Sequence, residues 1–139
     1  MYRIMAGYGA VSIGSLYTFG LEGIWLYDAE QKKIVPREMP EEKPKNREEA
    51  CRLLADWFLS RPLYQVFYHP QNKIDMMAAM ARQWNVDGVV LHMNRGCEGL
   101  SIGIAETRLG LINEGLQVMT YEGNMGDERE FDLEKTVVR

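Results

Sequence analysis

The chain has 139 residues, of which 46% are hydrophobic and 26% charged, the size and composition of one soluble globular domain. Sixteen basic and twenty acidic side chains give a formal net charge of -4, which argues against nucleic acid or an anionic membrane surface as a partner. No apolar run reaches the roughly 18 residues of a membrane span, and no signal peptide is expected. Two cysteines, Cys51 and Cys97, are too few for a disulfide framework, so we expect a cytoplasmic protein with reduced thiols.

The amino-terminal part of the sequence suggests short strands. Residues 2–5 and 10–19 are strand-like, and the four residues between them are too few for a parallel crossover, so the first segment forms a hairpin with the second or a loose edge. Residues 24–36 have apolar ends around a polar centre, which predicts a small hairpin or an irregular excursion. Residues 37–49 are rich in charge and proline, so we expect a charged loop insertion around 28–46.

The first predicted helix begins at Asn46, whose side chain can cap free amides while Glu49 reaches back in a capping box. The helix should end at the Ser-Arg-Pro segment, at about residues 60–62. Its apolar residues recur at helical spacing, on a face that we expect to be buried: Ala50, Cys51, Leu54, Trp57 and Phe58. Cys51 is therefore predicted to be a core residue.

The remainder of the chain alternates helices and strands. A second helix is predicted over 71–84, entered through His69, and its expected buried face is Ile74, Met77, Met80, Ala81 and Trp84. Residues 87–93 and 116–121 are short apolar runs typical of strands buried on both faces of a parallel sheet. A helix over 98–113, ending at Gly115 as a left-handed cap, should join them. Together with a last helical turn after a capping box at Asp127 and Glu130, this order predicts an α/β fold.

Ligands of open α/β sheets bind beyond the carboxyl ends of the strands, which here are residues 18–23, 94–99 and 122–127. Cys97 lies in the second of these segments, at the start of the predicted helix, where the helix dipole and Arg95 would favour a thiolate nucleophile or metal ligand. From its position alone, a small buried cysteine without a role is an equally good interpretation. The flanking glycines, which let a backbone approach a ligand closely, tilt the balance slightly toward function.

Other polar residues carry weaker signals. Glu22, Glu98 and Glu122 follow the three strands, and carboxylates that lie together alter one another's ionisation, although each alone is more often a solvated or capping residue. His92, inside an apolar strand, is better explained as a core histidine with one satisfied nitrogen than as a catalytic base. No glycine pattern matches a dinucleotide-binding loop, and no second cysteine accompanies Cys97 as an iron–sulfur cluster would require.

Two motifs together resemble a known family. A buried strand ending in His92 and then "NRGC" (94–97), followed one helix later by a strand ending in "EGNMGDEREF" (122–131), resembles the carboxyl-terminal part of subunits in the 2-hydroxyacyl-CoA dehydratase and benzoyl-CoA reductase family. The resemblance is closest to benzoyl-CoA reductase. Upstream segments such as "SLYTFGLEG" and "FYHPQNKIDMM" extend it over nearly the whole chain.

The resemblance implies a flavodoxin-like, three-layer α/β domain with a mainly parallel sheet, spanning 1–139 as the carboxyl-terminal domain of a larger subunit. Family subunits work as heteromers in which cysteines of different domains hold a [4Fe–4S] cluster beside an acyl-CoA thioester. Cys97 matches the cluster ligand of the last domain, and Asn94, Arg95, Gly96 and Glu122 would surround it. The implied chemistry is one-electron reduction of the thioester-conjugated system, with electrons from a separate ATP-hydrolysing iron–sulfur activator.

The chain also departs from the family. It lacks the preceding domain with its cluster cysteines, and a four-residue connection replaces a helix near its amino terminus, so we expect a shortened domain whose apolar surface promotes self-association. Isolated, it should be colourless and free of stoichiometric iron. The alternative interpretation is a truncated, cluster-free domain that acts only in binding or subunit assembly. A third is a generic flavodoxin-like domain with an unrelated ligand.

Overall fold

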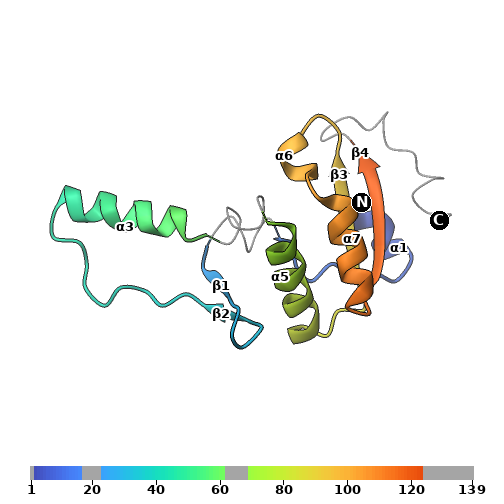
Figure 1. Ribbon diagram of the computed structural model, residues 1–139, viewed down its shortest axis with the longest axis horizontal. Helices are drawn as coiled ribbons and strands as arrows, with labels where there is room; N and C mark the ends of the chain where they lie inside the picture. The colour runs from blue at the N-terminus through green and yellow to red at the C-terminus, as the bar shows by residue number, and fades with distance from the viewer. Residues whose placement is uncertain (1, 17–22, 62–68, 124–139) are drawn as a thin grey trace. The chain divides into compact units, whose positions relative to one another are not determined.

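The computed structural model describes residues 2–16, 23–61 and 69–123 of the chain (Figure 1). The chain divides into two compact units, each described here by itself: residues 1–26 with 35–64, and residues 27–34 with 65–139. Helices combine with a small parallel sheet, which confirms the α/β class. Among the described residues, no helix has both the length and the apolar character needed to cross a membrane. The single domain over 1–139 stays a prediction.

The amino-terminal segment is helical, so the strand predicted over 2–5 is wrong. Helix α1 spans Tyr2–Gly7, and the turn after it closes through local bonds, with the Tyr8 and Ala10 amides both donating to the Met5 carbonyl at 3.0 Å. Local bonds of this kind satisfy the backbone without a partner strand, and α1 buries none of its residues. Residues 10–15 form no strand either, and the rest of that predicted strand lies outside the described residues except for one helical position, residue 16.

A hairpin follows, as predicted. Strands β1 (Trp25–Asp28) and β2 (Lys33–Pro36) form a two-stranded sheet, and the Asp28 carboxylate accepts bonds from the Glu30 and Gln31 amides at 2.9 and 3.0 Å, which fixes the turn. Residues 37–46 run as a loop to the next helix. The charged insertion predicted around 28–46 therefore contains strand β2.

Helix α3 (Arg47–Leu59) starts where the capping box predicts. The Glu49 amide donates to Asn46 Oδ1 at 2.9 Å, and the Glu49 carboxylate accepts from the Lys45 amide at 2.7 Å. No residue of α3 is buried, and Cys51 is exposed. The prediction that Cys51 is a core residue is wrong, because helical spacing shows which side chains share a face but not whether anything covers it.

Helix α5 (Pro70–Gln83) confirms the second predicted helix, with His69 at its N-cap and proline in its first turn. It ends in a Schellman motif in which Asn85 has a φ of +52° and the Val86 amide donates to the Ala81 carbonyl at 2.9 Å. The buried residues of α5 are Ile74, Met76, Ala78, Ala79, Met80 and Ala81. Helix α5, which is part of the second unit, thus has a broad buried apolar face.

Strands β3 (Gly88–Asn94) and β4 (Gln117–Gly123) are parallel and in register from the Gly88–Gln117 pair to the Asn94–Gly123 pair, as predicted. Helix α7 (Ile104–Asn113) joins them and ends in a second Schellman motif, with Gly115 at a φ of +85° and the Leu116 amide donating to the Leu111 carbonyl at 3.1 Å. The predicted glycine cap is therefore confirmed.

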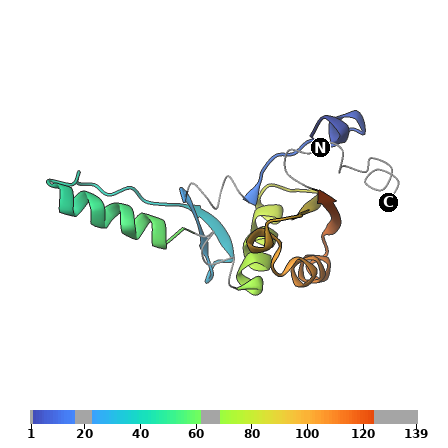
Figure 2. The ribbon, with the colours of Figure 1, turned by 90° about the horizontal axis from the view of Figure 1, so that it is seen from above.

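The core lies between the sheet and two helices, α5 and α7, which cover one face of β3 and β4 (Figures 1 and 2). Its buried members are Ile74, Ala78, Leu91 and Leu111, with Met77, Val89, Leu116 and Val118 packed around them. The two helices approach closely at Gly110, where a methyl group would lie 2.4 Å from Ile74 Cδ1. A glycine is needed at this crossing because any larger side chain would displace Ile74.

The opposite face of the β3–β4 sheet is partly exposed, whereas the sequence predicted strands buried on both faces. Side chains alternate along a strand, so Val90 and Met119 point away from the helices, and each is 37% exposed. Within the described residues, the second unit is therefore covered on one face of its sheet.

Candidate functional site

The candidate site lies at the carboxyl edge of the β3–β4 sheet, where the register pairs Asn94 with Gly123. Because both strands end at the same level, the segments after them meet at one edge, as the sequence predicted for 94–99 and 122–127. Only Glu122 and Gly123 of the latter segment are described, and of the third predicted segment, 18–23, only its last residue is.

A tight turn joins β3 to the cysteine. The Cys97 amide donates to the Asn94 carbonyl at 3.2 Å, which closes a four-residue turn over 94–97. Gly96, the third residue of this turn, has a φ of +89°, a conformation that favours glycine. Asn94 is buried, and its carbonyl also accepts a bond from the Ser101 hydroxyl at 3.0 Å. The backbone around the cysteine is thus fixed from both sides.

Cys97 is a free, half-buried thiol at the N-cap of α6 (Glu98–Ser101), and its side chain makes no capping bond there. The single helix predicted over 98–113 is wrong, because the chain breaks at Gly103, whose φ of +70° no helix interior allows. Helix α7 then starts afresh, with the Thr107 hydroxyl and amide donating to the Gly103 carbonyl at 2.6 and 2.8 Å. A four-residue helix has little macrodipole, so α6 offers a thiolate little electrostatic stabilisation.

Arg95 and Glu122 tie the turn to the neighbouring strand. Arg95 Nε lies 2.8 Å from Glu122 Oε1, and the Arg95 amide donates to the Gly123 carbonyl at 3.0 Å. The two side chains are about half exposed, so the ion pair contributes little stability, about 0–1 kcal/mol. Its effect is positional: it holds the end of β4 against the turn that carries Cys97.

His92 occupies the sheet face opposite the helices. Its Nε2 lies 3.2 Å from the Gly123 carbonyl, and because a carbonyl only accepts, Nε2 carries the proton. The ring stacks on Tyr121 with the centroids 4.6 Å apart. His92 is half-buried with one nitrogen bonded, close to the predicted core histidine.

The other predicted residues lie either at the starts of described helices or outside the described residues. Glu98 is exposed in the first turn of α6, and His69 serves as helix entry, as predicted. Glu22 lies outside the described residues. Among the residues that the structure describes, no group of three or more His, Cys, Asp or Glu side chains could hold a metal ion.

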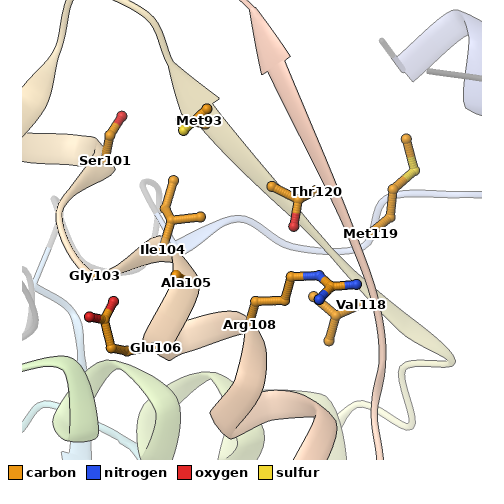
Figure 3. Close-up of a pocket in the computed structure, with 10 residues that line it drawn as sticks. All are labelled: Met93, Ser101, Gly103, Ile104, Ala105, Glu106, Arg108, Val118, Met119 and Thr120. Atoms are coloured by element: carbon orange, nitrogen blue, oxygen red, sulfur yellow. The ribbon is translucent and has the colours of Figure 1, made fainter. Parts of the chain in front are cut away.

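A groove of about 720 Å³ lies between α7 and the two strands, and the sequence did not predict it (Figure 3). It is lined by Met93, Ser101, Gly103, Ile104, Ala105, Glu106, Arg108, Val118, Met119 and Thr120. Residues 101, 104 and 108 follow one another at helical spacing, and residues 118 and 120 lie on the same face of β4. These two spacings are the sequence signal that could have suggested that the residues line one groove. The Gly103 break hides that signal, since it places residue 101 on another helix.

A second cavity, of about 460 Å³, lies between the hairpin tip and α5. Arg82 and Glu114, which line it and form an ion pair at 2.7 Å, come just before β3 and β4 begin, so it sits at the amino edge of the sheet. Burial, followed by the charge of Asp75, raises the pKa of Tyr27 there. Ligands of α/β sheets bind at the opposite edge, which favours the Cys97 edge and its groove.

A comparison with protein families finds a match over most of the chain. The model of the family described as 2-hydroxyglutaryl-CoA dehydratase, D-component, matches residues 16–138 of the chain. No curated protein and no solved structure matches the chain. The matched range includes the Cys97 turn, both strands and the groove.

Proposed function

The chain belongs to the 2-hydroxyglutaryl-CoA dehydratase D-component family, and on that basis we propose that it is a component of an iron–sulfur acyl-CoA reductase or dehydratase. In this proposal Cys97 supplies one thiolate ligand of a [4Fe–4S] cluster beside the acyl-CoA site. The observation that carries it is the position of Cys97, a free, half-buried thiol on the turn where β3 and β4 end.

The chain's own residues do not suffice for such a cluster. Several thiolates hold a cluster, about four in most proteins, and this sequence contains two cysteines, of which Cys51 is exposed on α3 in the other unit. We propose that the remaining ligands come from other subunits of the same complex. A separate ATP-hydrolysing activator would deliver the electrons, in the cytoplasm.

The residues around Cys97 would position the thiol rather than react. The Asn94 carbonyl holds the Cys97 amide, Gly96 supplies the turn, and the Arg95–Glu122 ion pair joins the turn to β4. Because these bonds involve backbone and charged groups already in place, the thiol needs little reordering on binding a ligand. This is the role that we propose for Asn94, Arg95, Gly96 and Glu122.

The fold that we propose for the complete domain is flavodoxin-like, with helices on both faces of a mainly parallel sheet. The order α5, β3, α7, β4, with parallel strands and both helices on one face, supports it. The exposed Val90 and Met119 mark the face that the third layer would cover.

Two branches of the family supply candidate substrates. The pairing of "NRGC" with the motif that begins at Glu122 supports a benzoyl-CoA reductase-like component acting on aromatic acyl-CoA. The matching family description supports a 2-hydroxyacyl-CoA dehydratase, and the hydroxyglutaryl group that it names ends in a free carboxylate. The two branches thus differ in the charge at the far end of the acyl group.

Iron analysis of the complex tests the role of Cys97. The chain should be produced anaerobically with the subunits encoded beside it, and iron, sulfide and visible absorbance measured for wild type, Cys97→Ser and Cys51→Ser. We expect Cys97→Ser to abolish the cluster and Cys51→Ser, the matched control on α3, to retain it. Full iron content in Cys97→Ser would contradict the proposal.

The same measurement on the chain alone addresses the second candidate, a cluster-free domain that acts in binding or assembly. The low number of cysteines favours that candidate. It is supported if the chain assembles with its partners and neither cysteine variant changes the iron content of the complex. We expect the isolated chain to contain no stoichiometric iron, and a brown absorbance lost in Cys97→Ser would show that several copies pool their thiolates.

A further inference from the structure

The groove between α7 and the sheet has an apolar middle and two different ends. Ile104 on the helix, with Met93 and Val118 on the strands, forms the apolar walls (Figure 3). Its volume of about 720 Å³ is within the range of small-molecule sites, about 300–1,000 Å³. All of its described lining residues belong to the second unit.

One end of the groove reaches the carboxyl edge of the sheet. Met93 directly precedes Asn94, and Ser101, also in the lining, donates its hydroxyl to the Asn94 carbonyl at 3.0 Å. This end therefore adjoins the turn that carries Cys97. A chain-like ligand whose reacting group lay beside Cys97 would extend from there into the groove.

The other end carries a positive charge, Arg108, which has no partner among the described residues. Arg108 lies one turn along α7 from Ile104, about 6 Å, and its side chain extends toward β4 near Val118 (Figure 3). In the described part of the chain no hydrogen bond or ion pair engages its guanidinium, and Arg108 is an exposed residue. Glu106, the one carboxylate among the described lining residues, extends away from it (Figure 3).

We infer that this groove holds the acyl part of the thioester and that Arg108 selects acyl groups that end in a free carboxylate. The inference rests on the proposed function for the position of the thioester. A guanidinium fork pairs with a carboxylate through two parallel bonds, whereas a neutral aromatic or alkyl end gives it no such partner. Thr120, also in the lining, adds a hydroxyl to the same wall. The groove thus favours the dehydratase branch over an aromatic substrate.

A pair of truncated thioesters tests this assignment without a cluster or the rest of CoA. The full chain is titrated with the N-acetylcysteamine thioesters of glutarate and of pentanoate, which differ in the terminal carboxylate, and the dissociation constants are measured by NMR at low salt. We expect the glutaryl thioester to bind roughly fivefold more tightly, the size of a partly exposed ion pair. Arg108→Gln should remove the preference, and Arg108→Lys should keep part of it.

Arg52→Gln is the matched control, because Arg52 is another exposed helical arginine, outside the groove. It should leave the preference unchanged. Equal affinities in the wild type, no binding of either thioester, or a preference that survives Arg108→Gln would each overturn the inference. The NMR spectra themselves show whether each variant is folded.

The two proposals can fail separately. A glutaryl preference that depends on Arg108, in a complex whose iron does not depend on Cys97, would keep the groove assignment and remove the cluster role. A cluster that depends on Cys97, with no glutaryl preference, would do the reverse.

Discussion

Helices α3 and α5 have similar apolar spacing in the sequence but different surroundings in the structure. On α3, Leu54 is 59% exposed and no residue is buried, whereas on α5 Ile74 is 6% exposed and Met76 1%. Helix α3 has its start fixed by local bonds at Asn46 and Glu49, and α5 is held by packing within the second unit. Periodicity therefore predicts a helix in both cases, and only the rest of the chain decides whether its apolar face becomes part of a core.

The sharpest test of this comparison replaces one leucine in each unit. Leu111 is fully buried in the core of the second unit, so Leu111→Ala should lower the free energy of unfolding by about 3 kcal/mol through lost contacts and the cavity left behind. Leu54→Ala, the matched change on α3, should cost less than about 0.5 kcal/mol. Urea denaturation of the full chain measures both, and similar losses would contradict the difference between the units.

The N-cap of α3 should matter next. Asn46→Ala removes the acceptor for the Glu49 amide and should cost about 1 kcal/mol of α3 stability. Faster hydrogen exchange of the α3 amides, with those of α5 unchanged, is the expected readout. Asn46→Asp keeps the acceptor and should behave as wild type. Faster exchange in α5 as well would show that the two units unfold together.

The smallest effect concerns Lys73 on α5. Burial of this side chain lowers its pKa. At neutral pH the folded state bears the cost of holding this charge, so Lys73→Met should stabilise the chain by roughly 0.5 kcal/mol. Between the lowered pKa of the folded state and the ordinary value of 10.5, the unfolded state binds more protons than the folded state. The wild type therefore gains stability as the pH rises, and the stability difference between Lys73→Met and wild type shrinks. Denaturation at pH 7 and pH 10 measures this, and a difference independent of pH would exclude the charge as its cause.

Much of the described fold follows from local sequence signals. Asn46 and Gly115 bound helices where the structure has them, and the apolar runs before and after α7 form the parallel pair. These features depend on hydrogen bonds within a few residues or on a simple apolar pattern. The same holds for the Cys97 turn, which the sequence placed at a strand end.

The features that were not predicted depend on contacts between distant segments. The break at Gly103 lies where a methyl group would come within 3.3 Å of Pro70 Cγ, a contact across more than thirty residues of sequence. The groove combines Met93, Arg108 and Thr120 from three elements, and only the register of β3 with β4 brings them together. The segment predicted as a strand over 2–5 is a helix, because β-branched and aromatic residues favour strands only where a neighbouring strand exists.

Gln83, at the end of α5, affects whether another chain can add a strand to β2. Its side-chain amide bonds both backbone groups of Ile34 in β2, accepting from the amide at 2.5 Å and donating to the carbonyl at 3.0 Å. A two-stranded sheet leaves open edges that invite another chain to add a strand. At Ile34 both backbone groups are already bonded to a glutamine, so α5 blocks the addition of a strand to β2 at this position.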